Sequence, residues 1–352
     1  MRLGLPRETK EGEKRVALLP AAVASLTSAG HAVLVESGAG RAIGHGDEAY
    51  VAAGASIVAR AEAWSAPLII KVKELQEAEL DRLPRDRCIF GFHHLPHEPE
   101  RTRGLAQRLA SAIAFEMVRD RDGGFPLLAP MSRIAGRMAI DVAARHLGPT
   151  PRRVRVLGAG HAGLAAAITA AGRGARVTLL SRSGYSGDAA REPGIEPGVA
   201  NAEAIEQAAL EADLVVGAVF VPASPTPKLV PRTLVRRMQP GAMIVDISID
   251  AGGVAETSRP TTHAEPTFVD EDVIHYAVPN MPAAEPAAAA AALSEAVLPY
   301  VRELCDKGVA RTLRENAALR AGIMVWKGRV NHPGVAAEAG LPYTPVTQAD
   351  LA

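Results

Sequence analysis

The chain has 352 residues, and its 39 basic residues balance its 39 acidic ones. The length predicts two domains, and the zero net charge argues against a nucleic acid or an anionic membrane as partner. Two cysteines, Cys88 and Cys305, cannot form a disulfide framework, so we expect a reducing, cytoplasmic location. We expect no signal peptide in the opening residues, and the alanine-rich run 287–293 is too short to span a membrane.

The first third of the chain alternates between short apolar runs and amphipathic stretches. Apolar runs predict strands at 2–5, 31–36, 56–59, 68–72, 88–92 and 112–118, and the amphipathic stretches predict helices at 20–28, 47–53 and 98–110. Strands that alternate with helices imply a parallel sheet. A helix predicted over 131–146 connects this α/β region to the next.

The second region repeats the pattern. Strands are predicted at 154–157, 176–180, 214–219, 242–247 and 274–278. An alanine-rich helix that ends at 172 follows the first of these strands, and further helices are predicted at 201–212, 231–238 and 287–307. We expect the Gly- and Pro-rich segment 184–200 to be a loop. The tail, 312–352, shows only short helical pieces, and we expect it to pack back on the first domain. The predicted domains are therefore 1–129 plus 306–352, and 130–305.

A glycine motif lies between the first strand and the first helix of the second region. Its sequence is Gly158-Ala-Gly160-His-Ala-Gly163. Gly158 allows a tight turn, Gly160 lets backbone N–H groups approach a pyrophosphate, and Gly163 lets the helix pack closely on the strand. The flanking strand, helix and second strand make this a dinucleotide-binding signal. The alternative is a glycine-bearing turn of another α/β protein.

The second strand of such a motif normally ends in an acidic residue that binds the ribose 2′-hydroxyl. Here Ser181 holds that position, followed by Arg182. A hydroxyl beside a guanidinium can bind a 2′-phosphate, which a carboxylate would repel. The cofactor is thus predicted to be NAD or NADP, with NADP favoured unless Arg182 is only a solvated loop charge.

Polar side chains follow several predicted strands, where open parallel sheets bind ligands. They are Arg15, Lys73, His93 and His94 in the first region, and Asp250 and Asn280 in the second. Lys73 has an alternative interpretation as part of a surface cluster with Lys71 and Glu74. Successive strand residues face opposite sides, so only one of the two histidines can line a site.

Two further points concern these strand ends. Asp246 and Asp250 share a face if both lie on the strand, which leaves the functional one open. A zinc site at HHLPH, residues 93–97, is not expected, because the paired histidines diverge, no cysteine is near and no acidic ligand is obvious. No metal is predicted.

Long segments carry a family resemblance over essentially the whole chain. They are MRLGLPRETKEGEKRVALLP, KVKE, PLLAPMSRIAGRMA, VDISIDAGGVAETSRPTTH and VPNMP. These segments resemble the alanine dehydrogenase family, whose superfamily includes the dinucleotide-binding subunit of proton-translocating transhydrogenase. The resemblance implies two Rossmann-like, doubly wound parallel-sheet domains with a cleft between them. It also implies a hexamer and NAD-linked oxidative deamination of alanine to pyruvate and ammonia.

The resemblance also implies site residues. Arg15 and Lys73 would hold the substrate carboxylate and carbonyl oxygen, His94 would be the general acid/base, and Asp250 the catalytic carboxylate. The choice of His94 and Asp250 within their pairs rests on the resemblance alone. Besides the motif glycines and Arg182, the expected cofactor contacts are Ser132, Ala162, Ser181, Val219, Phe220, Ile247, Ser248, Ile249, Asp250, Arg259, Val278, Pro279, Asn280 and Met281.

The chain departs from the family pattern at several places. Ser181 stands where the family has an acidic residue, Arg133 stands where one is usual, and Phe115 and Met117 replace more polar neighbours of Glu116. These differences affect the size of the substrate pocket, so the expected substrate is alanine or another small amino acid. One alternative is an NADPH-dependent reductive aminase that joins an oxo acid to an amine. Another is a non-catalytic nucleotide-binding module of transhydrogenase type.

Overall fold

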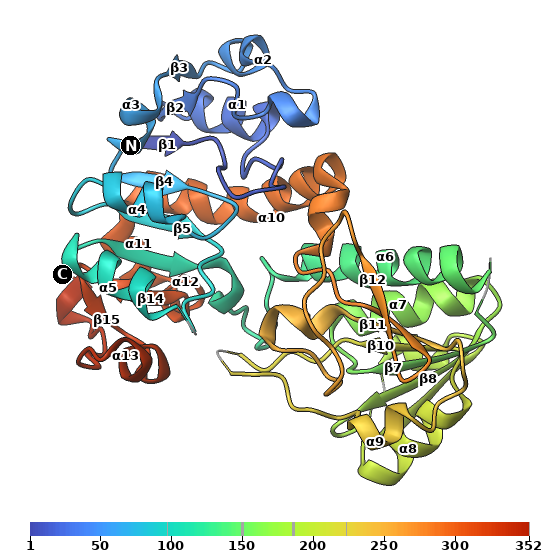
Figure 1. Cartoon of the computed structure of the whole chain (residues 1–352). Helices are drawn as coiled ribbons and strands as arrows, with labels where there is room; N and C mark the ends of the chain where they lie inside the picture. The colour runs from blue at the N-terminus through green and yellow to red at the C-terminus, as the bar shows by residue number, and fades with distance from the viewer. Residues whose placement is uncertain (97, 149–150, 185–186, 223, 352) are drawn as a thin grey trace. The chain divides into compact units, whose positions relative to one another are not determined.

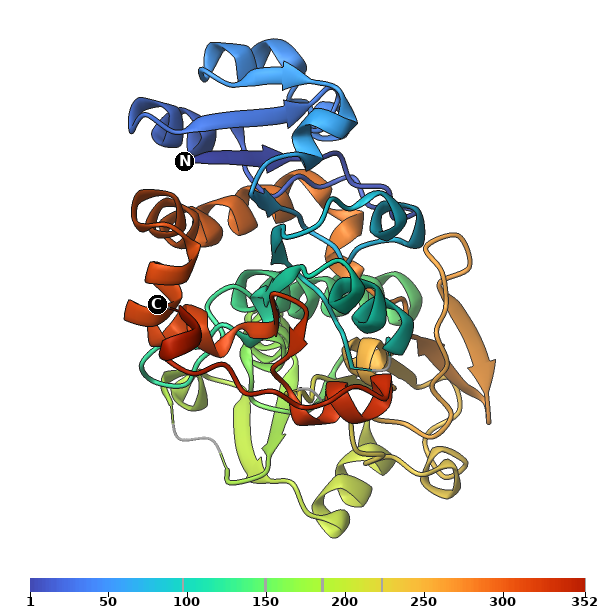
Figure 2. The same ribbon diagram turned by 90° about the vertical axis from the view of Figure 1, so that its left-hand side faces the viewer.

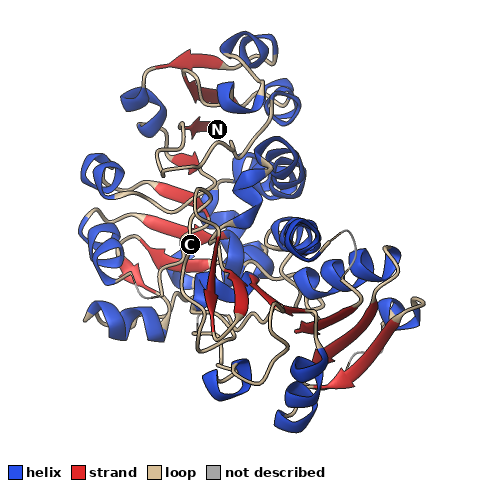
Figure 3. Cartoon of the chain, turned by 45° about the vertical axis from the view of Figure 1, so that its right-hand side comes forward, coloured by secondary structure: helices blue, strands red, loops and turns tan. Residues whose placement is uncertain are grey.

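The computed structural model describes residues 1–96, 98–148, 151–184, 187–222 and 224–351, without the side chains of 189 and 190. The chain divides into two compact units. Unit 1 comprises Met1–Pro130 and Glu285–Ala352, and unit 2 comprises Met131–Ala284. Each unit contains one mostly parallel sheet with helices between its strands (Figure 1, Figure 3). This confirms the predicted α/β class.

The sheet of unit 1 has the strand order β15-β14-β6-β5-β4-β1-β2-β3. From β3 to β6 the strands are parallel and follow the doubly wound order 3-2-1-4-5-6. Their bounds are β1 Arg2–Leu5, β2 Ala32–Glu36, β3 Ser56–Val58, β4 Leu68–Ile70, β5 Cys88–Gly91 and β6 Ser111–Ala114. Strands β4, β5 and β6 are buried along their whole length, as expected for a parallel sheet covered on both faces.

The connecting helices of unit 1 are α1 Pro20–Ser28, α2 Asp47–Ala52, α3 Arg60–Trp64, α4 Glu77–Arg82 and α5 Pro99–Gln107, with 3₁₀ turns η1 Arg41–Ile43 and η2 Phe115–Met117. The C-terminal part contributes α10 Pro286–Lys307, α11 Val309–Glu315, α12 Ala317–Ala321, β14 Ile323–Trp326, β15 Arg329–Val330, α13 Pro333–Ala339 and η6 Ala349–Leu351. β14 pairs antiparallel with β6, so the C-terminal segment, red in Figure 2, adds to the sheet that the N-terminal part of the chain forms.

The sheet of unit 2 has the order β12-β13-β11-β10-β7-β8-β9. From β9 to β13 the strands are again parallel in the order 3-2-1-4-5-6, and β12 adds an antiparallel edge. The strands are β7 Arg153–Leu157, β8 Arg176–Ser181, β9 Ile195–Val199, β10 Leu214–Gly217, β11 Met243–Asp246, β12 Thr267–Asp270 and β13 Val273–Tyr276. The helical elements are α6 Ala129–Leu147, α7 His161–Gly172, η3 Asp188–Arg191, α8 Ala202–Glu211, α9 Arg232–Val235, η4 Ile247–Ala251 and η5 Met281–Ala284.

Several sequence predictions were wrong in detail. The segment 184–200, of which 185 and 186 lie outside the described residues, is not all loop, because β9 pairs with β8 from Ile195 to Val199. Pro197 and Gly198 are tolerated there because β9 is an edge strand. The strand predicted over 112–118 ends at Ala114 and turns into η2. The tail contributes two strands that short helical pieces did not suggest.

The second unit boundary lies at residue 285, whereas the sequence suggested 306. The residues between these two boundaries form the helix α10, which belongs to unit 1 because its side chains bond to residues of that unit. The Ser294 hydroxyl accepts the backbone N–H of Leu19 at 2.9 Å, and Asp306 lies 2.8 Å from His31 Nε2. In the described part of the chain, no helix combines the length and the apolar character needed to cross a bilayer.

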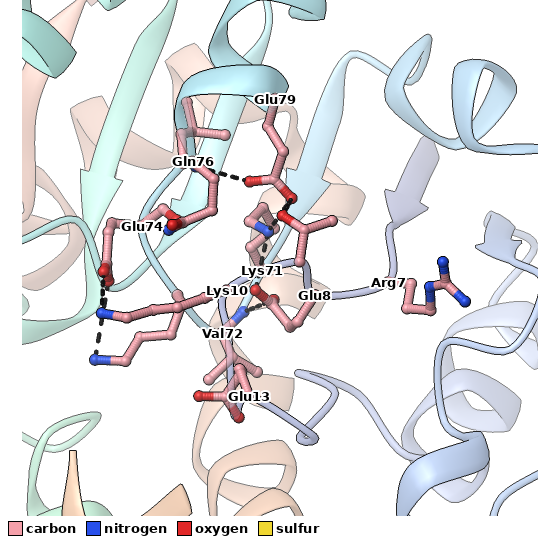
Figure 4. A network of polar contacts seen from close by, with 12 residues as sticks. Arg7, Glu8, Lys10, Glu13, Lys71, Val72, Glu74, Gln76 and Glu79 are labelled. Atoms are coloured by element: carbon pink, nitrogen blue, oxygen red, sulfur yellow. Dashed lines mark hydrogen bonds and ion pairs between the residues drawn. The ribbon is translucent and has the colours of Figure 1, made fainter. Parts of the chain in front are cut away.

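A buried ion network ties the loop after β1 to the loop after β4 (Figure 4). The Lys71 ammonium lies 2.9 Å from Glu8 Oε2 and 3.0 Å from Glu79 Oε1, and Lys71 is only 1% exposed. Glu8 also accepts the Val72 N–H at 2.6 Å, and Glu79 accepts the Thr9 hydroxyl at 2.7 Å. Burial raises the pKa of Glu8, although the Lys71 charge acts in the opposite direction. The two loops are therefore held by charges that compensate one another away from water.

Replacing Lys71 with methionine should lower the free energy of unfolding by about 3–5 kcal/mol at neutral pH, because two carboxylates lose their buried counter-charge. A carboxyl with a raised pKa stabilises the fold at low pH and loses that contribution as pH rises. The deficit should therefore be smaller at mildly acidic pH than at neutral pH, because protonation of Glu8 removes a buried charge. Urea unfolding at both pH values measures it, with the exposed Lys14→Met as control. A deficit that is independent of pH would contradict the interpretation.

Candidate functional site

The carboxyl ends of β1, β4, β5 and β6 lie at one edge of the unit 1 sheet, because these strands are parallel neighbours. The segments that follow them carry Arg15, Lys73, His94 and Glu116. Three of the sequence-predicted residues therefore reach one edge of one sheet from separate loops. Parallel pairing is the reason that residues far apart in the chain come together here.

Arg15 is buried and held by Glu13, a residue that the sequence analysis did not select. Its Nε donates to Glu13 Oε1 at 2.7 Å and its Nη2 to Glu13 Oε2 at 2.5 Å. The backbone N–H of Arg15 also donates to Glu13 Oε1, at 3.0 Å. A two-pronged contact of this kind fixes the plane of the guanidinium before any ligand binds. The sequence signal that could have identified Glu13 is its position two residues before the arginine.

Lys73 is part of a buried cluster. Lys71, Lys73 and Glu74 are 1%, 6% and 6% exposed, so the alternative of a surface charge cluster is wrong. Glu74 lies between two ammonium groups, with Lys73 Nζ 3.8 Å from Oε2 and Lys10 Nζ 2.5 Å from Oε1. Burial raises the pKa of Glu74, but the charges of Lys73 and Lys10 outweigh burial and lower the pKa to about 2. Glu74 is therefore ionised at neutral pH.

The two adjacent histidines differ in environment. His93 is buried, its Nε2 lies 3.2 Å from the carbonyl oxygen of Ile89, and burial lowers its pKa. The His94 side chain is 43% exposed, and its ring stacks on that of Phe92 with centroids 5.8 Å apart. His94 is thus the member of the pair that a ligand can reach, and Phe92 supports its ring.

Glu116, in η2, fixes the backbone of both histidines. It accepts the N–H of His94 at 2.7 Å and the N–H of His93 at 3.1 Å. His94 has a φ of 46°, an unusual value for a residue with a side chain, and the carboxylate stabilises that conformation. The Glu116 carboxylate also lies 3.9 Å from His94 Nδ1. Glu116 follows directly after β6, and this position at a strand end was the sequence signal that could have identified it as a site residue.

In unit 2 the glycine motif forms the turn between β7 and α7. Gly158 has a φ of 108°, and a Cβ there would lie 2.3 Å from the carbonyl oxygen of Ala218. A Cβ on Gly163 would lie 1.8 Å from the carbonyl oxygen of Gly158. Gly160 is the N-cap residue of α7, and no side chain caps the helix there. A Cβ on Gly160 would meet no heavy atom within 4 Å among the described residues. Two glycines are therefore needed for packing, whereas the third leaves open space at a helix N-terminus, which fits a pyrophosphate.

The other predicted cofactor contacts mostly follow strands of the same parallel sheet. Ser181 ends β8, Val219 and Phe220 follow β10, residues 247–250 form most of η4 after β11, and residues 278–281 follow β13. Ser248 joins two of these loops, since its hydroxyl accepts the Val219 N–H at 2.8 Å and donates to the Val219 carbonyl at 2.9 Å. The Ser181 hydroxyl oxygen is buried and has no hydrogen-bond partner among the described residues. The site can therefore offer a free hydroxyl where a ribose is expected.

Three predicted contacts have other surroundings. Ser132 lies near the start of α6, and Ala162 lies in the first turn of α7. Arg259 lies between η4 and β12, with its guanidinium 4.1 Å from the ring centroid of Phe268. Val278 and Met281 are buried. Arg182 is exposed at the end of β8.

The two aspartates after β11 do not share a strand face. β11 ends at Asp246, and Asp250 lies in η4, so the premise that both lie on the strand was wrong. Asp246 is buried and accepts the N–H groups of Val254 and Ala255 at 2.8 and 3.4 Å. Asp250 is exposed, and its Oδ2 accepts the N–H of Asn280 at 3.2 Å. Asp246 shapes the loop, and Asp250 presents a carboxylate at its surface.

No group of three or more histidine, cysteine, aspartate or glutamate side chains suited to a metal ion exists within the described residues. Position 97 of the HHLPH segment lies outside them. Cys88 and Cys305 are buried free thiols, and burial raises the pKa of Cys88 to about 12.

Sequence profiles of known families match almost the whole chain. The N-terminal domain of alanine dehydrogenase/PNT matches residues 4–135, and the C-terminal domain matches residues 132–333. The chain belongs to the alanine dehydrogenase/PNT family. The two profiles meet between residues 132 and 135, close to the first unit boundary at residue 130.

Individual members of the alanine dehydrogenase/PNT family are similar over their full length. An alanine dehydrogenase of Mycobacterium tuberculosis is 43% identical over 98% of this chain and 98% of its own. Those of Halomonas elongata and Bacillus subtilis are 41% and 38% identical, over 97% and 99% of this chain and 98% and 97% of their own. A solved L-alanine dehydrogenase has a TM-score of 0.87 and 39% identity, and covers 96% of this chain and 98% of its own. A transhydrogenase of Sinorhizobium meliloti, TM-score 0.79 and 22% identity, shares the fold over 95% of this chain and 99% of its own.

Two alanine substitutions in the glycine motif should have opposite effects. Gly163→Ala should destabilise unit 2 by about 3 kcal/mol, because the new Cβ meets a backbone oxygen that cannot move aside. Gly160→Ala should leave stability nearly unchanged and weaken nucleotide binding about tenfold, because its Cβ enters open space meant for the pyrophosphate. Thermal unfolding and nucleotide titration of both proteins measure the two effects. Equal nucleotide affinity of wild type and Gly160→Ala would remove Gly160 from the binding site.

Proposed function

We propose that this protein is an alanine dehydrogenase that catalyses the reversible oxidative deamination of L-alanine to pyruvate and ammonia with a nicotinamide cofactor. The observation that carries the proposal is the gathering of Arg15, Lys73 and His94 at one sheet edge, in a chain 43% identical to an alanine dehydrogenase. Unit 1 would bind the substrate and unit 2 the dinucleotide. The glycine motif in unit 2 supports this division.

Arg15 and Lys73 are proposed to bind the substrate. Both cations are buried, and Arg15 is oriented in advance by Glu13. A guanidinium and an ammonium can hold an α-carboxylate and an adjacent carbonyl oxygen in one orientation, which turns an encounter into a positioned reaction. The carboxylates of Glu13 and Glu74 lower the cost of burying these two cations.

His94 and Asp250 are proposed to assist the chemistry. His94 can accept a proton when water adds to the iminium and return it when the amine leaves, a contribution of about 10²–10⁴-fold. Asp250 presents an exposed carboxylate that can orient water or ammonia and stabilise a cationic imine. The bound nicotinamide supplies the hydride acceptor.

We further propose that the dinucleotide contacts the motif glycines, Ser181 and the loops after β10, β11 and β13. We also propose a homo-oligomer, a hexamer by family resemblance, and a cytoplasmic location. The buried free thiols Cys88 and Cys305 are consistent with a reducing compartment.

The activity is tested with purified protein, pyruvate and ammonia, followed at the nicotinamide absorbance. Turnover with ammonia is expected, and His94→Ala should lose most of it while nucleotide binding stays within about twofold. Turnover only when a primary amine replaces ammonia would favour the reductive aminase. Tight nucleotide binding without turnover would favour the non-catalytic module.

We propose that NADP is the preferred cofactor, because Ser181 offers an unpartnered hydroxyl and Arg182 an exposed guanidinium at the end of β8. Ser181→Asp should lower the NADPH to NADH ratio of kcat/KM by about tenfold, since a carboxylate repels the 2′-phosphate and replaces a charge-assisted hydrogen bond. The exposed Ser183→Asp serves as the matched control. A larger loss with NADH than with NADPH in Ser181→Asp would overturn the cofactor proposal.

A further inference from the structure

Glu74 carries a buried oxygen that the fold leaves without a donor. Its side chain is 8% exposed, and its two oxygens have different surroundings. Oε1 lies 2.5 Å from the Lys10 ammonium. Oε2 is fully buried but accepts no hydrogen bond from any described residue, and the Lys73 ammonium lies 3.8 Å from it, beyond hydrogen-bond distance.

A buried carboxylate oxygen without a donor is costly. Leaving a buried acceptor unsatisfied costs about 1–3 kcal/mol, and more when it is charged. The protein nevertheless keeps this group ionised, since Lys73 and Lys10 flank it. An oxygen in this condition will favour any ligand that brings an N–H or O–H group to it.

The position of Glu74 identifies which ligand that is. It directly follows Lys73, which with Arg15 is proposed to hold the substrate carboxylate and carbonyl oxygen. A free amino acid is a zwitterion, with a carboxylate and an ammonium on one carbon. The buried cations Arg15 and Lys73 complement the carboxylate, and the anion Glu74 complements the ammonium.

We propose that Glu74 Oε2 is the binding subsite for the substrate nitrogen: it accepts an N–H from the α-ammonium of the amino acid in one direction and from ammonia in the other. This inference rests on the proposed function. No bond is made or broken at Glu74, and the carboxylate holds the nitrogen in place while His94 exchanges protons. The subsite selects ligands that carry an amino group.

The test is Glu74→Gln, which keeps the shape of the side chain and removes its charge. The KM values for ammonia and for alanine should each rise about tenfold, because a charge-assisted hydrogen bond is replaced by a weaker neutral one. The KM for pyruvate, which has no N–H, should stay within about twofold at saturating ammonia. A merely structural role of Glu74 would raise all three KM values together, and that result would overturn the proposal.

Lys10→Met is the matched control, because it removes the other partner of Glu74 and leaves Oε2 in place. Its KM for ammonia should change less than threefold, and a rise equal to that of Glu74→Gln would show that Glu74 serves only to hold Lys10. If Glu74→Gln does not fold, Glu74→Asp replaces it, with an intermediate rise expected for ammonia and none for pyruvate. An unchanged KM for ammonia overturns the subsite, whereas wild-type protein inactive with ammonia overturns the proposed function itself.

Discussion

Parallel pairing of neighbouring strands is the constraint on which the rest of the structure depends. In each unit, six parallel strands in the order 3-2-1-4-5-6 bring their carboxyl ends to one edge of the sheet. Segments separated by dozens of residues, such as those carrying Arg15 and His94, then meet at that edge. The same rule in unit 2 gathers the glycine turn, Ser181 and the loops after β10, β11 and β13. A site of this kind needs no long-range motif in the sequence, because the sheet assembles it.

The charges at the edge of unit 1 come as compensated groups. Arg15 is paired with Glu13, Lys71 with Glu8 and Glu79, and Lys73 and Lys10 share Glu74. Buried ions cost desolvation energy, and each partner reduces that cost and fixes a side-chain orientation. The consequence is a set of buried cations that each have a carboxylate partner.

Loop anchoring in unit 2 uses backbone hydrogen bonds in place of ion pairs. Asp246 accepts two N–H groups from the far end of its own loop, and Ser248 bonds both polar groups of Val219. Asp250 in turn accepts the N–H of Asn280. The loops after β10, β11 and β13 are thereby connected to one another. An exposed carboxylate on such a network has a defined position even though it lies on a short 3₁₀ turn.

Local patterns were sufficient for much of the architecture. Apolar periodicity located most strands and helices of both sheets, and the glycine spacing located the turn between β7 and α7, because these signals depend only on neighbouring residues. The strands β9, β12, β14 and β15 were missed, because these segments are short and are stabilised as strands by pairing with a neighbouring strand. The end of β6 and the assignment of α10 to unit 1 likewise depend on partners distant in the chain.

The same division applies to the site. The sequence by itself determined the residue types, Arg15, Lys73, a histidine pair and an aspartate pair, at the ends of predicted strands. Only the tertiary structure decided that His94 is accessible while His93 is buried, and that Asp250 is exposed while Asp246 anchors a loop. It alone revealed Glu13, Glu74 and Glu116 as partners of the site. Burial and hydrogen-bond satisfaction arise between segments distant in the chain, and no local pattern records them.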